Sequence, residues 1–204
     1  MRLEIKGLTK RFGSFTANDA IDLVVEQSPS GQMEVIQGTQ EYDIKANWKL
    51  LVENSLDGYH VRPTHKTYFE YVNSLGINTS GVQTAFSRPA IVLGNGHAVE
   101  EHDGIRGRPI ARWSPLFGEE NKEEIAAIRA GLVRKFGEQK ARHIADISRN
   151  LLVYPNLLII DSIDITVRIF WPLAPDLMEV TAWQLAPKEE KPELLARRLD
   201  NFLT

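Results

Sequence analysis

Strand-like and helix-like runs are separated along this chain, and the separation limits the fold class. The last third carries β-rich runs at residues 156–161, 165–174 and 178–187, joined by short turns, as in an antiparallel meander. A strongly helical run, 119–147, precedes them, and an amphipathic helical run, 191–204, closes the chain. Because strands and helices are grouped rather than alternating, the sequence predicts an α+β fold.

The first part of the chain contains two more kinds of segment. Residues 3–12 and 20–26 alternate β-branched and polar residues around residues 13–19, which predicts a β-hairpin. Residues 76–114 are rich in Gly, Ser, Asn and Pro, and we expect strands joined by loops there.

Composition narrows the class of protein. The 204 residues are 43% hydrophobic and 25% charged, which suits one domain with a substantial core. No apolar run reaches the ~20 residues that span a bilayer, and the N-terminus lacks the apolar block of a secretory signal, so we expect a cytoplasmic protein. A net charge of −3 with scattered Lys and Arg argues against nucleic-acid binding. The absence of Cys excludes disulfides, thiolate nucleophiles, zinc ribbons and iron–sulfur ligation by this sequence.

The stretch NWKLLVENSLDGYHVRPTH, residues 47–65, combines helical periodicity with polar groups that are costly to bury without partners. Its apolar positions recur every three or four residues, which predicts a helix from Ala46 to Tyr59 that Asn47 or Asp43 caps. The apolar positions are Trp48, Leu51, Val52, Leu56 and Tyr59.

On such a helix, Glu53, Asp57 and His60 would share one stripe, flanked by Asn54. Pro63 should end the helix near Arg62 and begin another. That break would let His60 and His65 converge on one point, as a metal site requires. The alternative for a short DxxH motif is a local hydrogen-bonded pair on a solvated helix face.

We expect the other His and Asp residues with suggestive spacing to have structural roles rather than to bind a metal. His97 and His102 repeat the HxxxxH spacing, but neighbouring glycines predict a surface loop rather than a second metal site. Asp161 and Asp164 flank the predicted turn SID, where Asp is common for conformational reasons, although either could offer a carboxylate to a metal.

The string from 47 to 65 closely resembles the iron-binding segment of the large (alpha) subunit of Rieske-type aromatic ring-hydroxylating dioxygenases, with its NWK, EN, DxYH and following H. The resemblance runs from about Gln27 to the C-terminus and includes SRNLLVYPNLLIIDS and RIFWPLAPDLMEVTAWQLAP. It implies a helix-grip (START/Bet v 1-like) catalytic domain over residues 27–204, with an antiparallel sheet and a long helix.

The resemblance also implies roles for the polar residues. His60 and His65 would be the imidazole ligands of a non-haem Fe(2+). Asp57 would be the electron-transfer bridge to a cluster-ligating His of a neighbouring subunit. Asn54 would be a polar group in the site, and Glu53 a supporting residue.

Two departures from the family affect these expectations. The third ligand, an Asp, is expected beyond Thr204, so the catalytic domain would be incomplete at its C-terminus. The Rieske domain, whose 2Fe-2S cluster needs two Cys and two His, belongs to complete relatives only. Residues 1–26 instead resemble the start of an ABC-transporter ATPase subunit, although no phosphate-binding GxxxxGK[ST] follows, and we expect a foreign leader. The alternative is an ordinary hairpin of the same domain.

The sequence thus predicts an oxygenase catalytic domain that hydroxylates an aromatic ring with O2 and electrons from a Rieske cluster, inactive as this fragment. The implied partners are an aromatic small molecule, a reductase or ferredoxin in complete relatives, and a trimer with or without a small subunit. The competing hypothesis is a helix-grip module that binds an apolar ligand without turnover.

Overall fold

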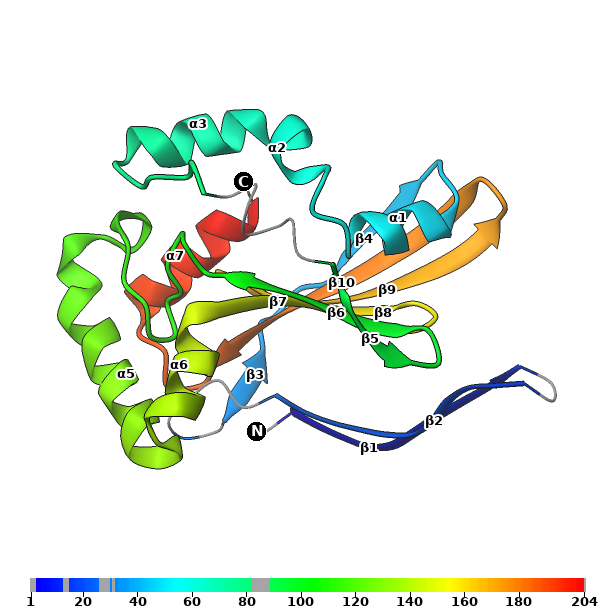
Figure 1. Ribbon diagram of the computed structural model, residues 1–204, viewed down its shortest axis with the longest axis horizontal. Coiled ribbons are helices and arrows are strands. Elements are labelled where there is room, and N and C mark those ends of the chain that lie inside the picture. The colour runs from blue at the N-terminus through cyan, green and yellow to red at the C-terminus, as the bar shows by residue number, and fades with distance from the viewer. Residues whose placement is uncertain (1–2, 13–14, 26–29, 31, 82–88, 204) are drawn as a thin grey trace.

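An eight-stranded antiparallel sheet forms the centre of the molecule (Figure 1). The computed structural model describes residues 3–12, 15–25, 30, 32–81 and 89–203. The strand order is β3-β10-β9-β8-β7-β6-β5, and β4 also pairs with β10. The strands are β3 (Met33–Val35), β4 (Gln40–Ile44), β5 (Ile91–Gly94), β6 (His97–Asp103), β7 (Ile147–Val153), β8 (Leu157–Asp161), β9 (Ile165–Ala174) and β10 (Leu177–Pro187).

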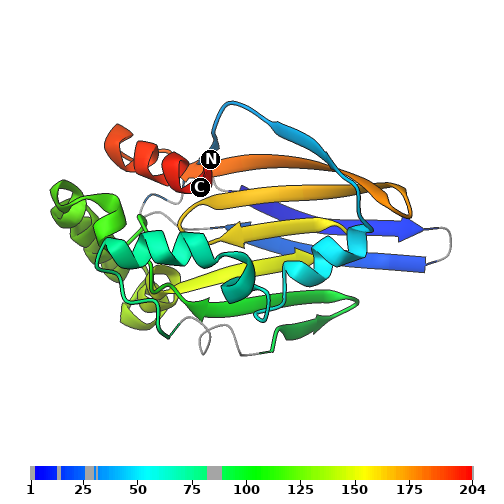
Figure 2. The ribbon, with the colours of Figure 1, turned by 90° about the horizontal axis from the view of Figure 1, so that it is seen from above.

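The helices fall into two groups around this sheet. Figures 1 and 2 show the first group, α1 to α3, lying over one face of the sheet, and the second group gathered toward one end. The first group is α1 (Trp48–Asn54), α2 (Val61–Thr64) and α3 (Lys66–Ser74), and the second is α5 (Lys122–Phe136), α6 (Glu138–Asp146) and α7 (Pro192–Leu203). Two short 3-10 turns, η1 (Pro115–Phe117) and η2 (Glu119–Asn121), lead into α5. This arrangement confirms the predicted mixture of helices and antiparallel sheet.

The predicted meander is confirmed, with one strand more than expected. β8, β9 and β10 pair in sequence order, and their register runs unbroken from Leu157–Ile169 to Asp161–Ile165 between the first two. The additional strand is β7, which pairs with β6 and β8 and begins where the predicted long helix was expected to end. All its side chains are partly or fully buried without regular alternation, so no period-two pattern marked where this strand begins after the helical run.

The predicted long helix from 119 to 147 is two helices. Gly137 separates α5 from α6 with a φ of 78°, a conformation that a residue with a Cβ rarely adopts. The predicted apolar face is nevertheless correct, since Ile125 and Leu132 are fully buried. Ile128, Val133 and Phe136 pack against the same core, and each fully buried aliphatic side chain contributes roughly 1.5–3 kcal/mol.

Two N-terminal strands form a separate two-stranded sheet. β1 (Leu3–Phe12) and β2 (Phe15–Val25) pair in antiparallel fashion, which confirms the predicted hairpin, with a longer second strand than expected. In Figure 1 the hairpin lies on the side of the large sheet that faces away from α1 to α3.

The helix predicted from Ala46 to Tyr59 is shorter in the structure. Asn47 caps α1 as predicted, because its Oδ1 accepts a hydrogen bond from the backbone N–H of Lys49 at 3.0 Å. Its Nδ2 also donates to the carbonyl of Pro175 at 2.7 Å, which ties the start of α1 to the turn between β9 and β10. The helix ends at Asn54, so the predicted stripe over Glu53, Asp57 and His60 does not lie on one helix.

The apolar side of α1 packs on the central strands. Trp48, Leu51 and Val52 contact the cluster of Leu158, Phe170, Met178 and Val180. Tyr59, predicted to share this side, is 66% exposed, because the chain has left the helix before reaching it. Within the described residues, no helix has the length and apolar character needed to cross a bilayer.

Candidate metal centre

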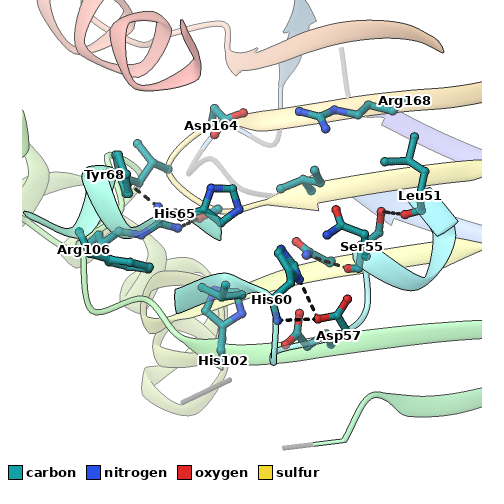
Figure 3. A pocket seen from close by; sticks show the side chains of 18 residues that line it. Leu51, Ser55, Asp57, His60, His65, Tyr68, His102, Arg106, Asp164 and Arg168 are labelled. Carbon is teal, nitrogen blue, oxygen red and sulfur yellow. Dashed lines mark hydrogen bonds and ion pairs between the residues drawn. The ribbon is translucent and has the colours of Figure 1, made fainter. Parts of the chain in front are cut away.

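A cavity of about 360 Å³ lies between α1–α3 and the sheet (Figure 3). One wall comes from the helical segment and the other from β6 to β9 and the loop after β6. The helical wall consists of Leu51, Asn54, Ser55, Asp57, His60, Val61, His65, Tyr68 and Phe69. The other wall consists of Glu100, His102, Arg106, Asn150, Ile160, Ser162, Ile163, Asp164 and Arg168.

The two predicted imidazoles meet in this cavity. His60 immediately precedes α2, and His65 separates α2 from α3. The predicted break at Arg62 and Pro63 is wrong in position, because both residues lie inside α2, where proline fits the first turn of a helix. The chain is non-helical at residues 55–60 and again at His65. Their ring centroids are 5.5 Å apart with an interplanar angle of 69°. With metal–nitrogen distances of about 2 Å, two imidazoles on neighbouring positions of one ion hold their centroids roughly 5 Å apart. The spacing therefore fits two ligands of a single metal ion.

Asp57 fixes the orientation of the first imidazole. Its Oδ1 lies 2.7 Å from Nδ1 of His60 and accepts a hydrogen bond from the backbone N–H of His60 at 3.0 Å. Because a carboxylate only accepts, Nδ1 carries the proton and Nε2 keeps the lone pair that can bind a metal. Both side chains are largely buried, with 17% of His60 and 11% of Asp57 exposed. The local pairing considered for a DxxH motif is thus present, but inside a cavity rather than on a solvated face.

The second imidazole lies at the rim of the cavity. His65 is exposed at the level of the whole residue, yet partial burial of its ring lowers its pKa. His60, when it is protonated, and the charge of Arg106 lower that pKa further. His65 is accordingly held in its neutral form, which is the form that binds a metal.

The loop that carries Asp57 is fastened to the sheet. Ser55 ends α1, and its Oγ donates to the carbonyl of Leu51 at 2.6 Å. The side-chain amide of Asn150, on β7, donates to the carbonyl of Ser55 at 2.9 Å. This bond joins residues 95 positions apart in the sequence, so the strand positions the segment between α1 and α2.

The remaining predicted residues are placed differently. Asn54 lines the cavity, whereas Glu53 does not, and its carboxylate accepts a hydrogen bond from the Tyr59 hydroxyl at 3.0 Å on the exposed side of the helix. In the part of the chain that the structure describes, no three His, Cys, Asp or Glu side chains form a metal-ligand cluster. The described residues therefore fit two imidazole ligands, and none of their carboxylates completes a three-ligand cluster with them.

The carboxylates near the SID turn have other partners. Asp161 is buried and pairs with the guanidinium groups of Arg108 and Arg149, so it is not available to a metal. Asp164 lines the cavity, and its Oδ2 accepts a hydrogen bond from the Thr166 hydroxyl at 2.6 Å.

The prediction of a surface loop for His97 and His102 is wrong. Both lie on β6 and are buried, because the glycines around them form the tight turn from β5 to β6 rather than a longer loop. Nδ1 of His97 accepts a hydrogen bond from the backbone N–H of Tyr154 at 2.9 Å. His102 lines the cavity, where burial and the charges of Arg106 and Arg108 lower its pKa to about 3.

Sequence reasoning also missed an acidic group in the cavity. Glu100 lies two positions before His102 on β6 and is only 2% exposed. Burial and, to a smaller extent, the negative charge of Asp57 raise its pKa to about 7, against an opposing effect of His60. The period-two spacing of Glu100 and His102 along a strand was the available signal that both side chains share a face.

Comparison with known proteins identifies the family to which the chain belongs. The family described as ring hydroxylating alpha subunit (catalytic domain) matches residues 34–204. The chain therefore belongs to the catalytic-domain family of ring-hydroxylating alpha subunits. The comparisons do not support the predicted resemblance of residues 1–26 to an ABC-transporter ATPase.

The curated relatives are large subunits of aromatic ring-hydroxylating dioxygenases. The chain is 35% identical over 182 residues to toluate 1,2-dioxygenase subunit alpha of Pseudomonas putida, covering 89% of this chain and 39% of that protein. It is 33% identical over 186 residues to the anthranilate 1,2-dioxygenase large subunit of Acinetobacter baylyi, and 31% identical over 186 residues to the 2-halobenzoate 1,2-dioxygenase large subunit of Burkholderia cepacia. Each match covers 89% of this chain, and the chain spans about two fifths of the length of these relatives.

Solved structures match the fold. A naphthalene 1,2-dioxygenase from Rhodococcus sp., bound to indole, superposes with a TM-score of 0.60 at 25% identity, covering 84% of this chain and 39% of that one. A second naphthalene 1,2-dioxygenase with indole in its active site gives a TM-score of 0.58 at 22% identity, covering 84% and 38%. The mixed helix and antiparallel-sheet fold is thus that of a dioxygenase catalytic domain.

Proposed function

We propose that His60 and His65 bind one Fe(2+) ion in this cavity, and that the complete protein hydroxylates an aromatic ring with O2. The observation that carries the proposal is the pairing of the two imidazoles 5.5 Å apart, with Asp57 holding Nδ1 of His60. Neutral imidazole suits Fe(2+), and ring-hydroxylating oxygenases of this kind bind it with two His and one carboxylate. Iron bound there would supply the O2-activating chemistry.

The chain's own residues position the ion and the substrate. Asp57 fixes the tautomer of His60 and, in our proposal, is the electron-transfer bridge toward a cluster in a neighbouring subunit. Asn54 contributes a polar group to the cavity, and Glu53 supports the turn by binding the Tyr59 hydroxyl. Apolar side chains such as Phe69 line the same space and would exclude water from an aromatic ring.

The third ligand is a carboxylate that we place beyond Thr204, as the family pattern implies. Within the described residues neither Asp161 nor Asp164 joins the two imidazoles in a three-ligand cluster. We also propose that residues 27–204 form a helix-grip domain and that residues 1–26 form a leader outside it, in line with the separate sheet of β1 and β2.

The electrons have to come from another centre. The sequence has no Cys, so a 2Fe-2S cluster of the Rieske type would be held by a part of the protein other than these residues. We propose that a reductase or ferredoxin delivers electrons to that cluster, that the complete protein forms a trimer with or without a small subunit, and that it works in the cytoplasm. The curated relatives are named for toluate, 2-halobenzoate and anthranilate, which are all aromatic, so we propose an aromatic substrate.

Anaerobic titration of the purified chain with Fe(2+) tests the metal site. We expect His60→Ala and His65→Ala each to weaken iron binding by at least tenfold, because each change removes one of two ligands. His143→Ala is the matched control, since His143 is 57% exposed and lies outside the cavity. Iron binding that survives both ligand changes would overturn the proposal. If an apolar aromatic compound binds equally well without iron and in His60→Ala, the alternative of a ligand-binding module without turnover is favoured.

A further inference from the structure

Two arginines of the cavity differ from the other sheltered arginines of the molecule. Five arginines that are not exposed have a carboxylate within 4.0 Å; these are Arg108, Arg112, Arg129, Arg149 and Arg198. Among the described residues, only Arg106 and Arg168 are sheltered without such an ion pair, and both line the cavity. A partly buried charge without a counter-charge is costly, so each of these two cations is a candidate to bind an anion in the cavity.

Arg106 is held in place by neutral groups. Its Nη1 donates to the Tyr68 hydroxyl at 3.2 Å, and its Nη2 donates to the Ser162 hydroxyl at 2.9 Å. The guanidinium carbon also lies 5.4 Å from the centre of the Tyr68 ring. Each terminal nitrogen carries two N–H donors, so one donor on each remains for a ligand after these bonds are made. The guanidinium is therefore oriented, but its charge is not neutralised.

The position of Arg106 places an anion next to the imidazoles. Figure 3 shows the guanidinium of Arg106 beside His65, at the same end of the cavity as Tyr68. In Figure 3 Arg168 lies on the opposite side of His65 from Arg106, with its guanidinium directed toward Asp164, and within the described residues its Nε has no hydrogen-bond partner. Of the two cations, Arg106 is the one that is both fixed and adjacent to the proposed metal site.

We propose that Arg106 binds the carboxylate of an aromatic acid in this cavity, with the ring of the acid directed toward His60 and His65; this inference rests on the function proposed above. Two parallel N–H donors of a guanidinium match the two oxygens of a carboxylate. Tyr68 and Phe69 line the same end of the cavity and offer apolar surface to the ring. A volume of about 360 Å³ lies within the usual range for small-molecule sites.

Equilibrium binding to the iron-free chain tests the proposal, with 2-aminobenzoate and its neutral isostere 2-aminobenzamide as probes and their fluorescence as the signal. The native chain should prefer the acid. Arg106→Gln should weaken binding of the acid by about 10- to 100-fold, the usual worth of a charge-assisted hydrogen-bonded pair, and leave the amide within about threefold. Arg106→Lys should recover part of the loss. Arg168→Gln, which removes the same charge from the same cavity, should leave the preference for the acid within about threefold.

Ser162→Ala provides a second test in case Arg106→Gln does not fold. Ser162→Ala removes one hydroxyl that aims Arg106 and keeps the charge, so it should weaken the acid alone, by about 3- to 10-fold. The proposal is overturned if the native chain shows no preference for the acid or binds neither probe. It is also overturned if both Arg106→Gln and Ser162→Ala leave the preference intact, or if Arg168→Gln removes it. Because no iron is present, these outcomes are independent of the His60 and His65 titration that tests the proposed function.

Discussion

The carboxylate of Asp57 and the ring of His60 are joined by a 2.7 Å hydrogen bond, and the same carboxylate oxygen accepts the backbone N–H of His60 at 3.0 Å. One side chain therefore sets both the position of the backbone and the direction of the imidazole. Asp57 supports the proposed ligand from behind without having to touch the metal.

Replacing Asp57 should show whether this residue only orients His60 or binds the metal itself. In Asp57→Asn the amide oxygen can still accept from Nδ1 of His60, so we expect most of the iron binding to remain, whereas Asp57→Ala should weaken it by roughly 10- to 100-fold. Anaerobic Fe(2+) titration measures both effects. In a complete enzyme, Asp57→Asn should instead slow electron delivery in single-turnover experiments. Loss of iron in Asp57→Asn as severe as in His60→Ala would show that Asp57 is itself a ligand.

The buried pair of Asp161 and Arg108 predicts a stability effect without a metal effect. Arg108 is fully buried, so Asp161→Ala leaves its charge uncompensated and should cost about 3–5 kcal/mol of unfolding free energy, measured by urea denaturation. Asp103→Ala, which removes an exposed carboxylate from its pair with the partly exposed Arg112, should cost less than about 1 kcal/mol. Iron affinity should be unchanged in both variants. A selective loss of iron in Asp161→Ala would make Asp161 the missing carboxylate.

His102 predicts a specific pH dependence of stability. The pKa of His102 in the folded chain is about 3, below the ordinary value of 6.5. Between pH 3 and pH 6.5 its imidazole is therefore protonated in the unfolded chain and neutral in the folded chain. Stability from this residue is present above pH 6.5 and is lost as the pH falls toward 3.

Between pH 6.5 and pH 4.5 the native chain should thus lose about 2 kcal/mol more unfolding free energy than His102→Gln, as measured by urea denaturation at each pH. Glu100 contributes in the opposite direction, because its raised pKa of about 7 costs stability as the pH rises from 4.5 to 7, but this contribution is common to both chains. Parallel pH profiles for the two chains would contradict the assignment.

The chain as printed should show no oxygenase turnover. Within the described residues no carboxylate completes a metal cluster with the two imidazoles, and the sequence has no Cys for a cluster that could deliver electrons. The measurement follows labelled O2 into an aromatic product with this chain as sole catalyst. Supplying the C-terminal carboxylate segment alone should tighten iron binding without turnover, and supplying the cluster domain and a reductase as well should give oxygen incorporation. Clear turnover by the unmodified chain that depends on His60 would refute this expectation.

Local patterns in the sequence were sufficient for part of the segment that carries the two imidazoles. The cap at Asn47 and the convergence of His60 and His65 both depend on residues within about twenty positions of one another. The predicted length of α1 was wrong for a local reason as well. Gly58 disfavours a helix, and the carboxylate of Asp57 binds a nearby backbone N–H, which competes with helical hydrogen bonds.

The other wall of the cavity could not be predicted in the same way. Glu100, His102 and Arg168 face the imidazoles only because β6 to β9 pair across the sheet, and single-sequence patterns do not reveal which strands become neighbours. The glycines beside β6 suggested a loop, although they form a tight turn with Asn95 at a φ of 49° and Gly96 at 84°. Charged residues on a strand resemble a solvated face until the helices that cover it are known.

The hydrogen bond from Asn150 to the carbonyl of Ser55 has a consequence for the order of assembly during folding. The segment between α1 and α2 is made early by the ribosome, but it receives this bond only after β7, almost a hundred residues later, has taken its place in the sheet. Until then the backbone in front of Asp57 and His60 lacks this anchor on β7. If the two imidazoles capture a metal ion as proposed, we therefore expect capture to follow sheet formation instead of nucleating it.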